Sequence, residues 1–418
     1  MANVYYTGAV QAVPRLYRIS ITGVVVGETY TVTVTGSSKF FRYKAVTGDT
    51  AALIVQGLLA AMAASVDGEV RELSGAADPL TAADFLVTGP ADGATVTLTA
   101  TATGAATISE TAVNAATGPY DTSAVGNYST GALPSAADNL ILYNQYGPKY
   151  NTTALAAIAL TSVQRRRNAT LNSPIGLPDV NQGGYLEYRP RHVQLNCPLF
   201  TLETSQGEQP QTVRFECLHT GSPAAVVITG DSSNSDLLPV VDFFGTPSNS
   251  TLNTAGASCG VATLTGSTSA VVTVTAGDSS LFIGVGATIG AINVENTRID
   301  LNANFATMVV SGSTSQVFAN GSAGTATTGS PGVTIEEGTV YWRSTGVPGD
   351  QVEIGGGGTL DMRLAPNVLP TFDIYASAGA SIFNDAGRIT LPYNVLPQNC
   401  RLQEIVVTTP NLSNIEFS

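Results

Sequence analysis

Short apolar segments recur through the second half of the chain at intervals of about one solenoid turn. Each segment alternates apolar and polar residues or is wholly apolar, and a turn rich in Gly, Ser, Thr or Asn follows it. Successive segments end 20, 16, 25, 19 and 20 residues apart. A repeat of strand and turn near this length, without helical periodicity, is typical of a parallel β-helix. The segments are Val272–Val274, Ile292–Val294, Met308–Val310, Val333–Ile335, Val352–Ile354 and Phe372–Ile374.

Two cysteines extend the repeat toward the N-terminus. Cys197 and Cys217 lie 20 residues apart in matching contexts, in which Val193 corresponds to Val213. We expect the two side chains to stack on adjacent turns, about 4.8 Å apart. That spacing exceeds the roughly 3.8 Å between the Cβ atoms of a disulfide. Reduced thiols in a core ladder are therefore the favoured interpretation, and a disulfide is the alternative.

A different pattern occupies the first quarter of the chain. Tyr30–Thr35 alternates between apolar residues and threonine, and after a Gly-Ser-Ser turn Phe40–Ala45 returns as its hairpin partner. A helix is predicted over residues 50–64, because its apolar residues fall on one side. Thr47 or Asp49 is the expected N-cap of this helix. The hairpin and the helix together predict a small α+β domain.

The chain is predicted to be mainly β, with the small N-terminal α+β domain followed by a parallel β-helix solenoid and a C-terminal capping strand region. Residues 116–135 are rich in small and polar residues, which favours a linker, and the polar segment 231–258 is expected to protrude as a loop. A cap is expected because an unpaired solenoid end invites aggregation. The predicted divisions are an extended arm (1–16), the α+β domain (17–115), the linker (116–135), the β-helix (136–390) and the cap (391–418).

The composition narrows the class of function. Charged residues make up only 12% of the chain, and Lys plus Arg number 18 against 31 Asp plus Glu, which gives a net charge of −13. A nucleic-acid backbone would be repelled by this charge, so no nucleic-acid partner is expected. The longest apolar stretch, Leu53–Ala64, is 12 residues long and interrupted, well short of the roughly 20 that span a membrane. No secretory signal precedes the first strand, so synthesis and assembly in a cytoplasm are expected.

Carboxylates in the repeats raise the question of glycan cleavage, which needs two carboxylates about 5 to 9.5 Å apart and an aromatic-lined groove. Glu353 and Asp373 share the middle position of successive segments, so they are expected on one outward ladder. A solvated face is the favoured interpretation, because aromatic residues make up only 7% of the chain and Trp342 is the one tryptophan. The candidate carboxylates are Asp300, Glu336, Glu337, Glu353, Asp361 and Asp373.

Other reactive groups form no catalytic, cofactor or metal pattern, and none of these sites is expected. His192 and His219 are the only histidines, and the chain contains no Cys-x-x-Cys. The Arg165–Arg167 triplet is interpreted as a solvated or salt-linked surface rather than an anion site. Gly355–Gly358 follows a strand but opens no helix, so it lacks the geometry of a phosphate loop.

Three stretches stand out together: Tyr30–Ala52, with its hairpin and helix start; Ile175–Pro190, which reads IGLPDVNQGGYLEYRP; and the Gly-rich Val352–Met362. The first resembles a small domain that recurs in structural proteins of tailed bacteriophages and prophages. The second, the most specific, resembles a motif of phage β-helix proteins often encoded near the head genes, and the third fits the same group. The resemblance covers most of residues 17–385. It implies a virion component and carries no catalytic residues over to this chain.

The first functional hypothesis is a non-enzymatic capsid cement or decoration protein, made in the host cytoplasm and located on the capsid surface of the virion. Its expected partner is the major capsid protein, and a homotrimer at local three-fold points is expected. The N-terminal segment Asn3, Val4, Tyr5 and Tyr6 is expected to be exposed and to contact a neighbouring subunit. The alternative for these four residues is an edge strand of the α+β domain.

Two other functions stay open. A trimeric tail fibre or tailspike would bind a receptor or glycan and would cleave it if a carboxylate pair were present. A bacterial surface adhesin or a pectate-lyase-like enzyme is disfavoured, because the sequence lacks a signal peptide and an Asp-rich calcium site.

Overall fold

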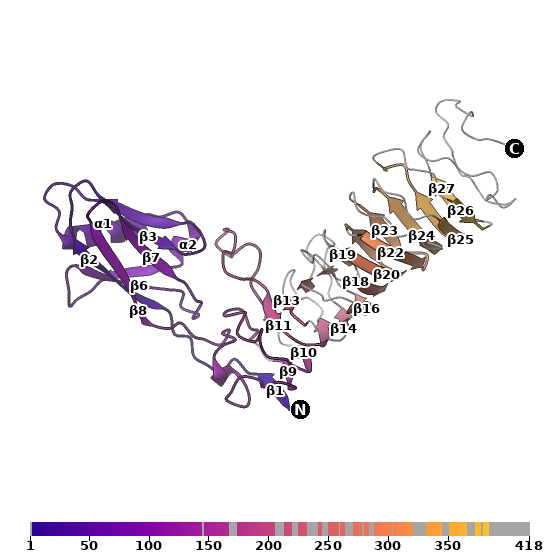
Figure 1. Cartoon of the computed structure of the whole chain (residues 1–418), viewed down its shortest axis with the longest axis horizontal. Helices are drawn as coiled ribbons and strands as arrows, with labels where there is room; N and C mark the ends of the chain where they lie inside the picture. The colour runs from indigo at the N-terminus through magenta and orange to yellow at the C-terminus, as the bar shows by residue number, and fades with distance from the viewer. Residues whose placement is uncertain are drawn as a thin grey trace, which may run out of the picture.

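The chain is mainly β, as predicted, and its two parts diverge from a common vertex (Figure 1). The N-terminal part is an α+β domain, and the second is a stack of strands that runs from magenta to yellow. The N-terminus lies at the vertex, beside the first strands of the stack. The computed structural model describes residues 2–143, 146–166, 174–204, 213–219, 225–231, 241–244, 250–258, 260–263, 271–277, 280–283, 288–302, 304–320, 332–344, 351–365, 373–377 and 379–383.

The N-terminal domain contains two antiparallel sheets, one ordered β5-β6-β2-β8 and the other β4-β3-β7. The predicted hairpin is confirmed, because β3 pairs with β4 in antiparallel register. The last strand, β8, was not expected from the sequence. The strands are β2 (Leu16–Gly23), β3 (Thr29–Val34), β4 (Phe40–Lys44), β5 (Ser74–Ala77), β6 (Asp84–Thr88), β7 (Leu98–Ala102) and β8 (Thr107–Asn114).

The predicted helix is confirmed as α1 (Ala51–Ala63), which packs against β4 and β5. Ile54 and Leu58 on its inner side are fully buried in the core of the domain. The expected N-cap was wrong: the Thr50 hydroxyl accepts the hydrogen bond from the Leu53 amide. Asp49 instead accepts from the Val46 amide and the Tyr43 hydroxyl. A second, short helix, α2 (Gly68–Arg71), follows α1.

The second part is a curled parallel sheet in which the strands form two ladders. Almost every strand pairs with the strand two places along the chain, so the two ladders alternate in sequence. The first ladder contains β9 (Asn139–Leu142), β10 (Ser162–Arg165), β12 (Leu199–Thr204), β14 (Ala225–Asp231), β16 (Ser250–Ser258), β18 (Val271–Gly277), β20 (Thr288–Glu295), β22 (Asn304–Ser311) and β26 (Asp373–Ala376). The second contains β11 (Val193–Leu195), β13 (Val213–Cys217), β15 (Val241–Phe244), β17 (Gly260–Thr263), β19 (Ser280–Ile283), β21 (Arg298–Leu301), β23 (Gln316–Ala319) and β27 (Ser381–Phe383).

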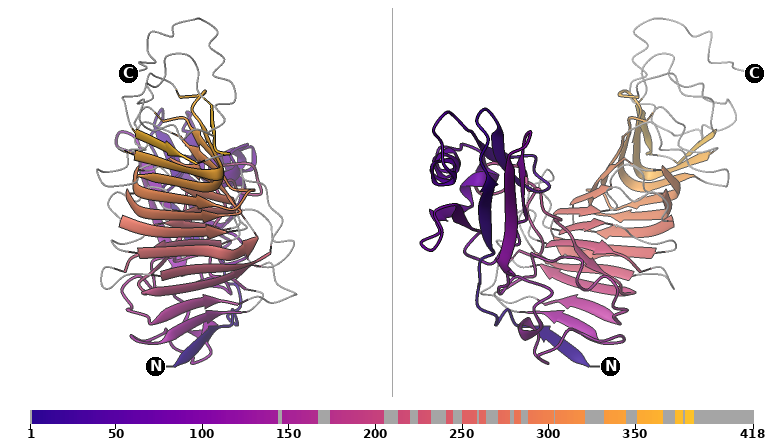
Figure 2. Two further views of the ribbon diagram at one scale, coloured as in Figure 1. Left: turned by 90° about the vertical axis from the view of Figure 1, so that its right-hand side faces the viewer. Right: turned by 60° about the vertical axis from the view of Figure 1, so that its left-hand side comes forward.

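Two long strands, β24 (Val333–Trp342) and β25 (Gln351–Asp361), belong to both ladders. Each one turns the corner between the ladders at glycine. Gly338 has φ +84°, and a Cβ there would meet the Ser315 carbonyl oxygen at 2.7 Å. Gly358 likewise lies against the Ile335 carbonyl. The Gly355–Gly358 run therefore serves a tight corner between stacked strands, and the views in Figure 2 show these strands stacking as successive rungs.

A continuous apolar core lies inside the curled sheet. On β24 the alternate side chains Val333, Ile335, Val340 and Trp342 are all fully buried. Alternation in a strand sends these residues to one face and the polar residues between them to the other. The described residues show two parallel ladders around a shared core, and they do not by themselves show a closed solenoid.

The N-terminal segment is part of the parallel sheet: the extended arm predicted over residues 1–16 contributes a strand to a sheet that was expected to begin near 136. β1 (Asn3–Tyr6) pairs in parallel with β9, with Val4 opposite Leu140. Its other edge is covered by the segment around Tyr128, whose neighbour Ser129 donates its amide to the Tyr5 carbonyl. This cover closes the end of the sheet against further pairing.

Residues 116–135 form a folded junction rather than the predicted linker. The short 3-10 helix at Val125–Asn127 places the Asn127 side chain in the interior. Its amide donates to the carbonyls of Gly118 and Asp121, and its oxygen accepts from the Val10 amide. Small and polar residues serve here to satisfy buried backbone groups, which composition alone does not distinguish from a flexible linker.

Two other expectations concern the loops and the end of the chain. The segment 231–258 was expected to protrude, but β15 and β16 lie within it and continue both ladders. The threonine residues of β16 are compatible with a β-strand. The predicted cap at 391–418 lies outside the described residues.

Candidate functional site

A loop from the parallel sheet reaches the N-terminal domain and is fastened there by one carboxylate. Glu72, just after α2, accepts hydrogen bonds from the hydroxyls of Tyr185 and Tyr188 at 2.7 and 2.6 Å. The Arg189 guanidinium adds an ion pair to Glu72 at 3.3 Å and a shorter one to Glu187 at 2.8 Å. These five residues, which we call the clamp, join segments more than 110 residues apart in the chain.

The clamp residues are largely shielded from solvent, and this burial shifts the pKa values of their side chains. Burial, together with the hydrogen bond to Glu72, raises the pKa of Tyr185 and of Tyr188, so both hydroxyls stay protonated donors. Burial alone would lower the pKa of Arg189, but its hydrogen bond to Glu187 and the charge of Glu72 outweigh that and raise it. The Arg189 guanidinium also lies over the Tyr188 ring, 5.0 Å from its centroid. Charge-assisted hydrogen bonds of this kind are roughly twice as strong as neutral ones.

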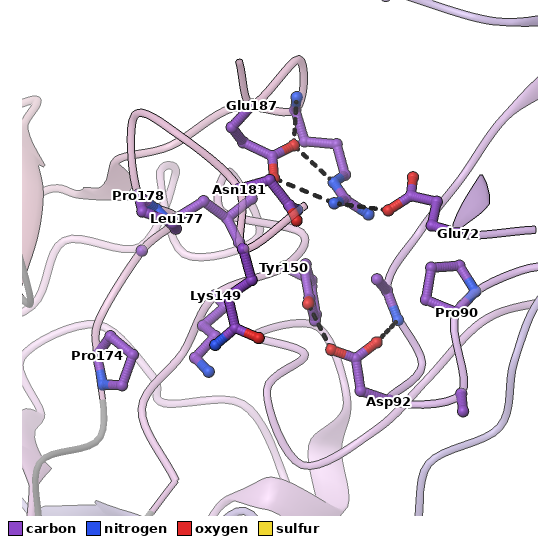
Figure 3. A pocket seen from close by; sticks show the side chains of 15 residues that line it. Glu72, Pro90, Asp92, Lys149, Tyr150, Pro174, Leu177, Pro178, Asn181 and Glu187 are labelled. Atoms are coloured by element: carbon purple, nitrogen blue, oxygen red, sulfur yellow. Dashed lines mark hydrogen bonds and ion pairs between the residues drawn. The ribbon is translucent and has the colours of Figure 1, made fainter. Parts of the chain in front are cut away.

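A pocket of about 350 Å³ adjoins the clamp (Figure 3). Its walls come from the turn at 90–94 of the N-terminal domain and from residues 149–189 of the second part. Asp92 accepts from the Tyr150 hydroxyl at 2.6 Å and from the Ala94 amide at 3.0 Å. The Lys149 ammonium lies 4.0 Å from the centroid of the Tyr120 ring.

A second charged cluster holds the base of the same loop. Arg214, on β13, is almost completely buried and pairs with both oxygens of Asp179 and with Asp242 at 3.4 Å. His192 Nε2 lies 3.0 Å from the same Asp242 carboxylate. The loop is therefore anchored at its base in the parallel sheet and at its tip on the N-terminal domain.

The four N-terminal residues predicted to be exposed divide into two pairs. Val4 and Tyr6 are 1% and 2% exposed and pack in the core of the parallel sheet, so their predicted exposure was wrong. Asn3 and Tyr5 face outward, because successive side chains of a strand point to opposite faces. Asn3 accepts a hydrogen bond from Asn139. The partner-contact role of the segment stays a prediction, now confined to Asn3 and Tyr5.

The expected outward pair Glu353 and Asp373 is not in register. Glu353 lies opposite Tyr375, and Asp373 lies opposite Gln351, two residues away from the expected alignment. Glu336 and Glu337 are adjacent exposed residues of β24.

The remaining two candidate carboxylates each have an arginine partner. Asp300 pairs with Arg298 at 3.4 Å, and Asp361 pairs with Arg363 at 2.6 Å. Asp300 and Asp361 occupy one ladder position but are three strand steps apart, roughly 14 Å at the usual strand spacing.

Aromatic residues lie between these two carboxylates on the same ladder, which composition alone did not reveal. Phe318 stacks on Tyr341 with 4.6 Å between centroids. The guanidinium groups of Arg298 and Arg343 lie 4.6 and 4.7 Å from the Phe318 centroid. We call these four residues the aromatic strip.

The two described cysteines are buried free thiols, which agrees with the favoured interpretation. Their stacking differs from the prediction by two residues, because Leu195, not Cys197, lies opposite Cys217. Cys217 Sγ lies 3.8 Å from the Cys197 carbonyl oxygen. Burial raises the pKa of the Cys217 thiol to about 11 and raises the pKa of Cys197 as well.

Other predicted surface groups have ordinary partners. His219 Nδ1 lies 3.2 Å from the Asn196 side chain. Arg165 is buried and donates to the Glu203 carbonyl, Arg166 donates to Gln164, and Arg167 lies outside the described residues. Within the described ranges, no group of three His, Cys, Asp or Glu residues is placed to hold a metal ion. No helix in that part of the chain is long and apolar enough to cross a membrane.

Comparison with known proteins adds no family assignment: no family model matches the chain, and no curated protein matches it.

Proposed function

We propose that the chain is a non-enzymatic structural protein that binds and stabilises the head shell of a tailed bacteriophage, as a cement or decoration protein. In this proposal the two ladders are faces of a parallel β-helix that forms a stiff body on the capsid surface. The major capsid protein is the partner, and the protein acts as a homotrimer. The phage assignment comes from the resemblance of Tyr30–Ala52, Ile175–Pro190 and Val352–Met362 to virion proteins.

The observation that carries the structural role is an apolar register shared by successive strands of the first ladder. Ile292, Met308, Val333 and Val352 lie opposite one another on four successive strands, and none is more than 1% exposed. Each such side chain contributes about 1.5 to 3 kcal/mol when it is fully buried. Neighbouring strands therefore stabilise each other over these four rungs, as expected of a stiff body built from stacked repeats.

Stiffness favours binding to an assembled lattice. A rigid body loses little conformational entropy when it docks, and a protein that binds only the assembled shell stabilises that shell by mass action. The clamp supports the proposal because it fastens the α+β domain to the stack, so both parts can bear on one shell. Exposed Tyr5 and its neighbour Asn3 are the proposed contacts at the vertex.

Quantitative mass spectrometry of purified particles tests this function. A copy number comparable to that of the main shell protein is expected, and the protein should sediment with assembled shells but not with dissociated shell subunits. Absence from the particle, or sedimentation with neither form, would remove the cement proposal.

The aromatic strip favours a second candidate, a tail fibre or tailspike that binds a glycan. The partly exposed Tyr341 ring, which stacks on the buried Phe318 ring, is the kind of aromatic surface against which a sugar ring packs. Cleavage has less support, because Asp300 and Asp361 are farther apart than the 5 to 9.5 Å of glycosidase carboxylates. A handful of copies per particle, with glycan binding lost in Tyr341→Ala, would favour this candidate.

A further inference from the structure

The pocket beside the clamp combines carboxylates that already accept hydrogen bonds from the chain with cationic groups that have unused donors. Three carboxylates line it: Glu72, Asp92 and Glu187. Glu72 accepts from two tyrosine hydroxyls and Arg189, and Asp92 accepts from Tyr150 and a backbone amide. Glu187 accepts from the backbone amide and the guanidinium of Arg189. The acceptors of the pocket are thus already used by the chain itself.

The donors differ. Lys149 forms no ion pair within 4 Å among the described residues, and its ammonium rests on the face of the Tyr120 ring. Burial lowers the pKa of Lys149, against the nearby charge of Asp92, so its environment disfavours an unpaired positive charge. Arg189, whose side chain is nine-tenths buried, has one terminal nitrogen, Nη1, without a hydrogen-bond partner. Both residues line the pocket.

The walls set the size and character of a ligand. Leu177 and three prolines supply apolar surface, and the Asn181 side chain adds a polar edge (Figure 3). A volume of about 350 Å³ is at the lower end of sites for small organic molecules. The neighbouring carboxylates oppose a doubly charged group such as phosphate, whereas a single negative charge would pair with the free ammonium.

We propose that this pocket binds one carboxylate group, held by Lys149 and carried on a compact apolar or sugar-like body. The group belongs either to a small organic acid, such as a sugar acid, or to an Asp or Glu side chain of a partner protein. This proposal does not depend on the virion role, since it follows from the donors and acceptors of the pocket.

The lysine content makes a direct test possible. The chain contains three lysines, Lys39, Lys44 and Lys149. Lys39 is paired with Asp67 and Lys44 is exposed on β4. Reductive ¹³C-methylation keeps the charge of each lysine and gives each one a resolvable NMR signal, assigned with the single variants Lys39→Arg, Lys44→Arg and Lys149→Arg.

The probes are propionate, which mimics a glutamate side chain, and glucuronate, with glucose and inorganic phosphate as comparisons. Saturable shifts of the Lys149 signal with the carboxylates, but not with glucose, are expected, while Lys39 and Lys44 stay unchanged. Phosphate should bind more weakly than either carboxylate. Saturation by glucuronate at lower concentration than by propionate assigns the pocket to a sugar acid, and the reverse order assigns it to a protein side chain.

Thermal stabilisation of the unmethylated chain gives an independent measurement. Lys149→Met should raise the concentration of the better carboxylate that gives half-maximal stabilisation by about tenfold or more, since a charge-assisted hydrogen bond is lost. Lys44→Met, the matched control, should leave that concentration unchanged. Equal shifts of all three lysine signals, a non-saturating response, or full stabilisation of Lys149→Met would overturn the proposal.

Discussion

The Tyr185 hydroxyl donates a hydrogen bond to Glu72 Oε2 at 2.7 Å, across 113 residues of sequence. The contact joins the tip of a loop from the parallel sheet to the end of α2 in the N-terminal domain. It is reinforced by the seat of the Tyr185 ring on Gly68, where a Cβ would lie only 1.9 Å from the ring. The clamp thus contributes to the relative placement of the two parts through a few partly buried polar groups.

Replacing Glu72 tests that dependence. Glu72→Gln keeps the size of the side chain but removes the negative charge that pairs with Arg189. Its amide group also places N–H donors opposite the hydroxyls of Tyr185 and Tyr188, which are donors themselves. We expect a loss of about 1 to 3 kcal/mol in the free energy of unfolding, the usual cost of breaking a buried charged hydrogen bond. Urea denaturation measures it, and Glu337→Gln on the exposed face of β24 is the matched control. Equal stability of both variants and the parent would mean that the clamp contributes nothing.

Asp138 should make the end of the parallel sheet sensitive to acid. It accepts from the Ser135 hydroxyl and from the Ala2 amide, next to β1, and these bonds lower its pKa from 3.8 to about 2. A lowered folded-state pKa gives stability that is complete above the unfolded pKa near 4 and is lost as the pH falls from there through about 2. Asp138→Asn should therefore be less stable than the parent at pH 7, and the difference should shrink between pH 4 and 2. A difference that is constant with pH would contradict this role.

The buried thiols should be inert while the chain is folded. Burial raises the pKa of Cys217 to about 11, so almost no thiolate is present at neutral pH. Peptide-mapped alkylation should label Cys197 and Cys217 only after denaturant is added, and the melting temperature of the parent should not change with reductant. Rapid labelling in buffer, or a melting temperature that falls with reductant, would show an accessible thiol or a disulfide.

The register predicts which deletions the stack tolerates. Val352 lies opposite Ile374, and Leu360 lies opposite Ile382, each 22 residues further along. Deletion of residues 352–373 should leave a folded, shorter chain, because Ile374 takes the inward position of Val352 and neighbour contacts dominate in stacked repeats. Deletion of 352–372 moves Asp373 into that position and turns the following residues to the wrong face. Circular dichroism and melting of the two variants should differ sharply, and equal behaviour would argue against the ladder register.

The errors in the predicted register have one physical origin. Val310 lies opposite Ile335, and Ile335 opposite Ile354, as the repeat predicted. Val274, however, lies opposite Ile292 rather than Val294, and Ile354 lies opposite Ala376. Both errors are of two residues, which is the period of side-chain alternation in a strand. Apolar patterning therefore indicates which face is buried, while turn lengths, which it does not reveal, decide the alignment.

The sequence predicted the fold better than it predicted the clamp and the role of the N-terminal strand. The alternation Asn-Val-Tyr-Tyr at residues 3–6 did permit a strand, but only the pairing with β9 shows that Val4 and Tyr6 are core residues. Tyr185 and Tyr188 lie in the Ile175–Pro190 motif, but neither of them was assigned a separate role from the sequence. Nothing in the local pattern, though, points to Glu72 as their partner, because the contact depends on how two separately folded parts meet.

The central claim is that the α+β domain and the parallel sheet form one stiff body. Double electron–electron resonance between spin labels at Val66 and Leu364, two exposed residues at distant parts of the chain, measures this directly. Labels on a keto amino acid at these positions leave the native cysteines untouched. The account predicts one narrow distance distribution in the parent that broadens in Glu72→Ala. A broad distribution in the parent, unchanged by Glu72→Ala, would contradict it.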